Sequence, residues 1–265
     1  MEKGNRSFPA GGIALVLILG LTASCASGPG AKKNVEKDPR HQYNLGLIYL
    51  NNLAADETAL NKAIVHFRKA LALDPKHFLA LNALGLAHSM KGDLGQAAEA
   101  FQKCLEINPS FTEARNNLGS IYEAQGFLDR AEAEYKKALA DENYVSRQLP
   151  LYNLARMAFR QDKTKEASDY LDRALRYDPR MAMGHNLKGM ILEKLEDNEG
   201  ALISYEKAAR LVPDDMNLLF NAGRLCAKTG RPERARDILT TVLEKSDDPE
   251  LRKKASEALA SLKKP

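Results

Sequence analysis

The sequence repeats itself with a fixed period of 34 residues. Residues 78–111 and 112–145 can be written as two lines in which the same kinds of residue fall in the same columns. The matched pairs are Leu84 with Leu118, Gly85 with Gly119, Ala97 with Ala131, and Phe101 with Tyr135. Each line holds two runs of helical length, separated by a short turn at Gly92 or Gly126. Such a period predicts an array of stacked helix pairs in which each pair contacts only its neighbours.

The small and bulky columns have a physical explanation in helix packing. We expect Gly85 and Gly119 to lie where the first helix of a repeat (helix A) crosses the second (helix B), because a side chain there would hold the helices apart. Phe101 and Tyr135 then fill the space at the crossing. Pro109 stops the second helix of its repeat, since proline cannot continue a helix.

This column pattern resembles the tetratricopeptide repeat (TPR). Less regular copies precede and follow the two clear ones, and a charged stretch with a stripe of Leu and Ala comes last. The resemblance implies an all-α fold, a right-handed TPR solenoid of about six helix-turn-helix repeats plus a C-terminal capping helix, with the A helices lining a concave groove. The predicted repeats are 39–77, 78–111, 112–147, 148–181, 182–215 and 216–249, followed by a capping helix and tail at 250–265.

Residues 1–24 have the layout of a secretory signal peptide. Lys3 and Arg6 precede a short apolar run, Ile13–Leu21, which falls below the roughly 20 residues of a membrane span. Small residues follow at once, so this segment is expected to be removed rather than to form part of the fold.

The four residues Thr22-Ala23-Ser24-Cys25 resemble a bacterial lipobox, with Thr22 where Leu is usual. The resemblance implies that Cys25 carries acyl chains such as palmitate and that residues 25–38 form a flexible tether. Ala26, in place of Asp, implies sorting to the outer membrane with the helical body facing the periplasm. The alternative is an ordinary signal cleaved near Ala23 or Ala26, which would leave a soluble periplasmic protein.

Composition and motif content indicate a protein that is not an enzyme. Lys plus Arg total 39 and Asp plus Glu total 35, with the signs interspersed, so the sequence shows no concentrated basic face for nucleic acid. The five His lack metal-ligand spacing, and no phosphate loop or nucleophile motif occurs. We expect no cofactor, no metal and no small-molecule substrate. Cys104 and Cys226 occupy packing columns and are expected to be buried free thiols.

Asparagine recurs on the A helices, next to the Leu-Gly column. In TPR proteins this column faces the groove, where an Asn amide can bond both N–H and C=O of an extended peptide. The alternative is that these Asn serve helix packing alone. The candidate partner-binding residues are Asn44, Asn82, Asn117, Asn153, Asn186 and Asn221, flanked by Tyr152, Arg156, Phe220 and Arg224. Aromatic and Arg side chains beside them favour a protein partner.

Together, the lipobox and the six repeats resemble the type IV pilus biogenesis and stability lipoproteins, the TPR pilotins that help the outer-membrane secretin to assemble. The resemblance rests most on Asp129–Met157, which holds an irregular connection at 141–150 before Tyr152-Asn153-Leu154. It implies a secretin subunit as the protein partner and a lipid anchor in the membrane. The alternative is a general periplasmic TPR adaptor that recruits peptidoglycan enzymes or envelope and export machinery.

Overall fold

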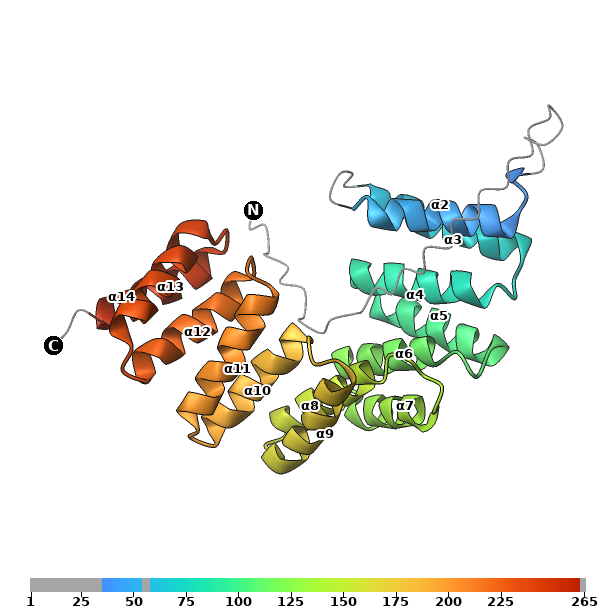
Figure 1. Cartoon of the computed structure of the whole chain (residues 1–265). Coiled ribbons are helices and arrows are strands. Elements are labelled where there is room, and N and C mark those ends of the chain that lie inside the picture. Colours follow the sequence, from blue (N-terminus) through green and yellow to red (C-terminus); the bar gives the residue numbers. More distant parts are fainter. Residues whose placement is uncertain (1–34, 54–57, 263–265) are drawn as a thin grey trace. The chain divides into compact units, whose positions relative to one another are not determined.

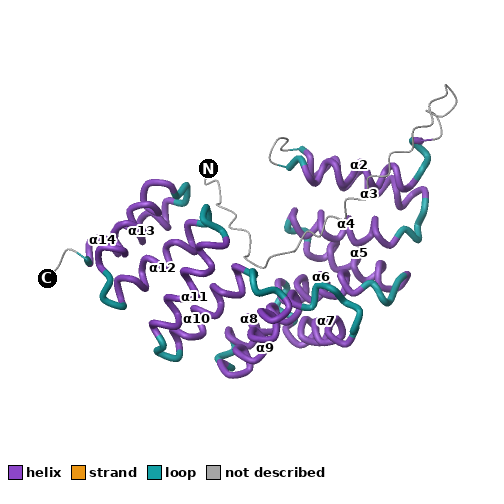
Figure 2. Tube along the Cα trace, in the orientation of Figure 1, coloured by secondary structure: helices purple, strands orange, loops and turns teal. Residues whose placement is uncertain are grey.

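The chain consists of helices throughout the part that the structure describes. The structure is a computed structural model that describes residues 35–53 and 58–262. In these ranges thirteen helices, α2 to α14, follow one another, and no strand occurs (Figures 1 and 2). The predicted signal peptide and the predicted lipid site at Cys25 lie outside the described residues. The helices fall into two compact units, one ending at Val145 and the other beginning at Ser146.

The first unit contains three helix pairs. Within each pair the two helices pack on each other, and each pair packs on the next through its B and A helices. Its A helices are α2 (Pro39–Asn51), α4 (Phe78–Lys91) and α6 (Thr112–Ala124), and its B helices are α3 (Ala59–Leu73), α5 (Leu94–Ile107) and α7 (Leu128–Ala140).

The second unit contains three further pairs and one additional helix. Its A helices are α8 (Gln148–Arg160), α10 (Ala182–Lys194) and α12 (Met216–Lys228), and its B helices are α9 (Thr164–Tyr177), α11 (Asn198–Leu211) and α13 (Pro232–Lys245). The additional helix is α14 (Pro249–Ser261), which packs mainly on α13.

Local sequence signals explain where several helices begin. The Asp215 carboxylate accepts hydrogen bonds from the backbone N–H groups of Asn217 and Leu218, and thereby caps α12. Asp248 caps α14 in the same way, and Pro249 occupies the first turn, where a missing N–H costs nothing.

In the second to sixth repeats, one residue of the turn between the A and B helices has a left-handed backbone. Gly92 and Gly126 both have φ of 84°, a conformation that glycine adopts without steric cost. In the fourth and fifth repeats this position is held by Asp162 and Glu196, with φ of 61° and 63°. The same turn is therefore kept in these repeats by residues that strain the backbone.

Glycine on the A helix allows an aromatic ring from the B helix to lie directly against the backbone. A Cβ atom added to Gly119 would lie 2.7 Å from the ring of Tyr135, and one added to Gly85 would lie 2.7 Å from the ring of Phe101. These rings are fully buried. The packing columns of the sequence thus correspond to real helix crossings.

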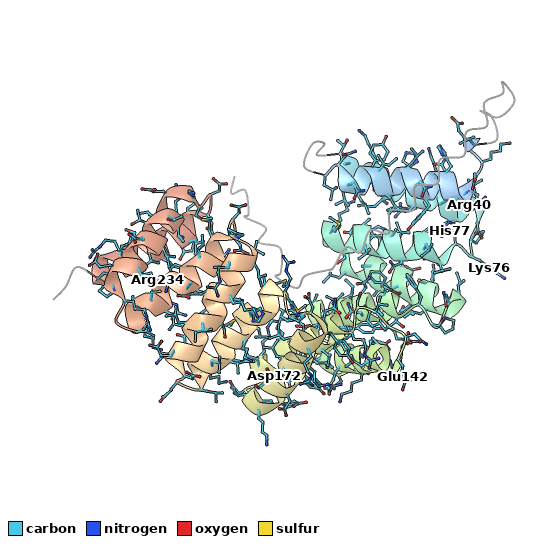
Figure 3. All side chains as sticks on the ribbon, viewed as in Figure 1. Arg40, Lys76, His77, Glu142, Asp172 and Arg234 are labelled. Carbon is cyan, nitrogen blue, oxygen red and sulfur yellow. The ribbon has the colours of Figure 1, made fainter. Side chains whose placement is uncertain are left out.

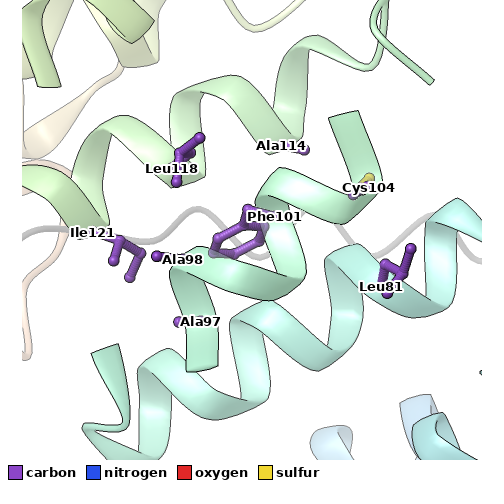
Figure 4. Close-up of a cluster of buried hydrophobic side chains, with 8 residues drawn as sticks. All are labelled: Leu81, Ala97, Ala98, Phe101, Cys104, Ala114, Leu118 and Ile121. Carbon is purple, nitrogen blue, oxygen red and sulfur yellow. The ribbon is translucent and has the colours of Figure 1, made fainter. Parts of the chain in front are cut away.

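Figure 4 shows how neighbouring repeats share one core in the first unit. Phe101 of α5 lies between α4 and α6. It is packed with Leu81 of α4 and with Leu118 and Ile121 of α6. Cys104 belongs to the same cluster, and its thiol donates a hydrogen bond to the carbonyl of Phe78 (3.2 Å). Both Cys104 and Cys226 are buried and free.

Helix α14 covers the last helix pair. Leu251 and Ala255 are buried on its inner side and form a cluster with Val242 of α13. The outer side carries the charged residues Arg252, Lys253 and Lys254, which are exposed. This distribution lets the array end without an exposed apolar face.

Candidate protein-interaction site

The predicted partner-binding residues lie on the A helices of the two units. Four of the six Asn are joined in two side-chain pairs. In the first unit the Nδ2 of Asn117, on α6, donates to the Oδ1 of Asn82, on α4, over 3.3 Å. In the second unit the Nδ2 of Asn221, on α12, donates to the Oδ1 of Asn186, on α10, over 2.9 Å. Asn82 and Asn186 lie three residues before the packing glycine of their helices, whereas Asn117 and Asn221 lie two residues before theirs. This difference of one position accompanies the hydrogen bonds between the amides of adjacent A helices.

Arg224 is held inside the second unit by Glu193. Its two terminal guanidinium nitrogens each donate to one carboxylate oxygen of Glu193, both over 2.7 Å. The hydroxyl of Tyr205 donates to the same carboxylate over 3.2 Å, and the ammonium of Lys228 lies 3.6 Å from it. Arg224 thus spans α10 and α12 and fixes the spacing of these helices.

This arrangement strongly favours the charged form of Glu193. The hydrogen bonds from Arg224 lower the pKa of Glu193 from its ordinary value of 4.5 to about 2. The same bonds raise the pKa of Arg224. Burial, followed by the neighbouring carboxylate, raises the pKa of Tyr205, so this phenol stays protonated and remains a donor. The cluster is therefore a permanent ion pair at neutral pH.

A related contact occurs in the first unit, where the Tyr135 hydroxyl donates to Glu123 over 3.2 Å. Glu123 and Glu193 each lie four residues after the packing glycine of their A helix. They occur in the two repeats in which the B helix carries Tyr, and the other repeats carry Phe or Leu there. The binding residues predicted from the sequence did not include these carboxylates, although the occurrence of Tyr and Glu in the same repeats is a signal in the sequence.

The remaining predicted residues differ in exposure. Asn44 is exposed on α2, whereas Asn153 on α8 is buried. Tyr152 is also buried, and the guanidinium of Arg156 lies over its ring at 5.9 Å from the centroid. Phe220 is half-buried and packs against the core of the second unit. Contact of these residues with a partner stays a prediction.

Charged groups on the outside of the helices are largely paired with one another. Asp172 accepts from Lys188 over 3.1 Å, and Arg234 lies 2.8 Å from Glu206; Figure 3 labels Asp172 and Arg234. Within the described ranges, no three His, Cys, Asp or Glu side chains group as a metal site would require. His88 and His185 are buried, and burial lowers the pKa of each ring.

None of the helices in the described part of the chain has both the length and the apolar character that crossing a bilayer requires.

Family models described as tetratricopeptide repeat match residues 78–111, 112–141, 152–215 and 193–263. The chain belongs to the TPR family. This confirms the prediction of an all-α TPR solenoid, and the structure supplies its helix pairs. TPR proteins bind other proteins, so the chain is a protein-interaction scaffold. No curated protein matches the chain in sequence.

Solved TPR structures share the fold at low sequence identity. PilF of Pseudomonas aeruginosa matches with a TM-score of 0.70 and 21% identity over 86% of this chain and 99% of its own. PilW, described as a widely conserved type IV pilus biogenesis factor, matches with a TM-score of 0.70 and 20% identity. The match covers 81% of this chain and 97% of the PilW chain. The Cut9–Hcn1 complex matches with a TM-score of 0.72 and 18% identity over 86% of this chain but 43% of its own.

Proposed function

We propose that this TPR protein assists type IV pilus biogenesis by binding secretin subunits and bringing them to the outer membrane. In this proposal acyl chains on Cys25 anchor the protein, and the helical body faces the periplasm. Two acyl chains give stable anchoring, because each buried methylene contributes about 0.8 kcal/mol.

The observation that carries the proposal is the extent of the match with two pilus proteins. PilF and PilW are similar to this chain over 99% and 97% of their own lengths, so they have little beyond the helices present here. Cut9–Hcn1, which is not a pilus protein, has a comparable TM-score over 43% of its own length. The signal-like residues 1–24 and the lipobox-like Cys25 add support from the sequence.

The A-helix faces offer a chemical basis for holding an extended segment of the partner. In the Asn186–Asn221 pair one carbonyl and one amide are used internally. The amide of Asn186 and the carbonyl of Asn221 are left to bond a backbone C=O and N–H. The Asn82–Asn117 pair likewise uses one carbonyl and one amide internally, and there Asn82 is half-buried while Asn117 is buried. An Asn pair of this kind would form hydrogen bonds with the main chain of the peptide, and neighbouring side chains would select the peptide sequence.

The test is the state of the secretin in cells from which the gene has been deleted. Heat-resistant secretin multimers on an immunoblot should disappear, and complementation with the wild-type chain should restore them. The Cys25→Ser chain, expressed at the same level, should leave the secretin monomeric or in the wrong membrane. Normal multimers in the deletion strain would contradict the proposal, and crosslinking to peptidoglycan enzymes would then examine the adaptor alternative.

A further inference from the structure

One group of residues on an A helix occurs twice in the chain at a constant offset. Helix α4 carries Leu79, Asn82 and Leu86, and helix α10 carries Met183, Asn186 and Met190. The offset is 104 residues in each case (79 to 183, 82 to 186, 86 to 190). Spacings of three and seven residues put all three members on one face of a helix. Each unit therefore has an apolar–amide–apolar stripe, hereafter the amide stripe, on its middle A helix.

The amide stripe is not a general property of the repeats. At the same three positions the first repeat has Arg40, Tyr43 and Leu47, and the third has Glu113, Asn116 and Ser120. The fourth and sixth repeats have Arg156 and Arg224 at the last of these positions. The stripe thus occurs in the second and fifth repeats alone.

The surroundings of the two stripes also match. In each unit the Asn of the stripe accepts a hydrogen bond from an Asn located 35 residues later on the next A helix. These donors, Asn117 and Asn221, are themselves 104 residues apart. The amide is consequently held in one orientation in both units, which removes part of the entropic cost of binding.

The apolar members of the second stripe are exposed, whereas in the first stripe Leu86 also packs against the core of its unit. Met183 and Met190 are 37% and 40% exposed, and Leu79 and Leu86 are half-buried. Methionine adapts its shape readily and is common at protein-binding surfaces. In the second unit the nearby cation Lys188 is already paired with Asp172.

From these observations we infer that the chain has two equivalent sites, one per unit, each of which binds an extended segment of uncharged apolar residues from a protein partner. The inference rests on the proposed function, because it assigns partner binding to the A-helix faces. Charge complementarity selects this occupant, since the stripes carry no ionisable group, and Lys188 and Arg224 beside the second stripe are already paired with Asp172 and Glu193. One chain would therefore hold two segments of its partner at once.

The two sites differ in the charges beside the stripe: α10 and α12 carry the Glu193–Arg224 ion pair, where α4 and α6 have Ser89 and Ser120 at the same offset of 104 residues. Glu113 on α6 is replaced by Asn217 on α12 at the same offset of 104 residues. Glu113 is half-buried.

The experiment measures how many peptides one chain binds. The full chain with Cys25→Ser is used to select short randomised peptides by phage display, and the selected peptide is synthesised for calorimetric titration. The expected result is two peptides per chain. Leu86→Asp and Met190→Asp should each remove one site, with a loss of about tenfold or more in affinity there. The double variant should bind none.

Matched controls make the same change on B helices. Val65→Asp on α3 and Ile203→Asp on α11 replace apolar residues that are 50% and 64% exposed, and both should still bind two peptides. If Leu86→Asp or Met190→Asp lowers the melting temperature, Leu79→Asp or Met183→Asp takes its place. One peptide per chain overturns the two-site inference and leaves the proposed function standing. If no peptide is selected, the A-helix faces are not the binding surface and the two-site inference falls, whereas the proposed function stands or falls with the secretin immunoblot.

Discussion

Glu193 and Arg224 join two successive A helices of the second unit through two hydrogen bonds of 2.7 Å each. The pair is partly shielded, since the Glu193 side chain is 20% exposed and that of Arg224 is 36% exposed. Tyr205 from α11 adds a third donor to the same carboxylate. One carboxylate thereby connects α10, α11 and α12, and its charge state bears on the stability of the whole unit.

We predict that Glu193→Gln destabilises the chain at neutral pH by about 2 kcal/mol, allowing for solvent around Arg224. The pKa of Glu193 is depressed to about 2, so its contribution is complete above the ordinary value of 4.5 and is lost as the pH falls toward 2. The difference between variant and wild type should therefore shrink between pH 4.5 and 2. Urea unfolding across this range is the measurement.

The control for this prediction is Glu199→Gln, which removes a bidentate pair with Arg231 on the exposed surface. Both side chains there are in water, so no resolvable change in unfolding midpoint is expected. An equal loss of stability in both variants would show that the Glu193–Arg224 ion pair does not cause the destabilisation. A loss of stability in Glu193→Gln that is independent of pH would show the same.

A larger side chain at Gly119 should destabilise the first unit. Its Cβ would lie 2.7 Å from the ring of Tyr135, which is fully buried and cannot move aside without opening the crossing of α6 and α7. Gly119→Leu is expected to cost about 2 kcal/mol by overpacking. Gly95→Leu is the matched change at a helical glycine with open space around it, and should be neutral or slightly stabilising. A melting temperature for Gly119→Leu within a degree or two of the parent would refute the close packing of α6 on α7 at Gly119 and Tyr135.

The hydrogen bond between Asn186 and Asn221 should appear as a coupling energy. In a double-mutant cycle with Asn186→Ala and Asn221→Ala, we expect a coupling of about 0.5 to 1.5 kcal/mol in unfolding free energy. A cycle between Asn186 and Asn44, which lie in different units, should be additive and serves as the comparison. Additivity in both cycles would mean that the two amides do not hold each other in solution.

The buried thiols of Cys104 and Cys226 should be unreactive in the folded protein. Burial raises the pKa of Cys104 to about 12, and burial also raises the pKa of Cys226. Because the thiolate is the reactive form, a Cys25→Ser chain should not react with a disulfide reagent at mildly alkaline pH. The same chain in guanidinium chloride should release two equivalents of reaction product. Rapid reaction of either thiol without denaturant would place it outside the core.

Much of the fold follows from the sequence alone, because helix pairing in a repeat protein is local. The period of 34 residues and the Gly, Ala and aromatic columns are determined by contacts between residues close along the chain, such as Gly119 with Tyr135. Periodicity also located α14, since its stripe of Leu and Ala matches the face that packs on Val242. The turn glycines were recognisable for the same reason, whereas Asp162 and Glu196 at positive φ were not, because nothing in their identity requires that conformation.

The candidate site depended more on tertiary structure. The sequence placed six Asn on the A helices, but a single helix cannot show that Asn82 bonds Asn117 or that Asn186 bonds Asn221. It also predicted Arg224 as a residue for a partner, and only the packing of α12 on its neighbours shows that Glu193 already binds it. The residues that pack the two helices of a repeat lie within that repeat, so the sequence by itself determined the array of helix pairs. Side-chain pairing between repeats depends on distances between helices, and only the folded structure decided which polar groups form hydrogen bonds with one another.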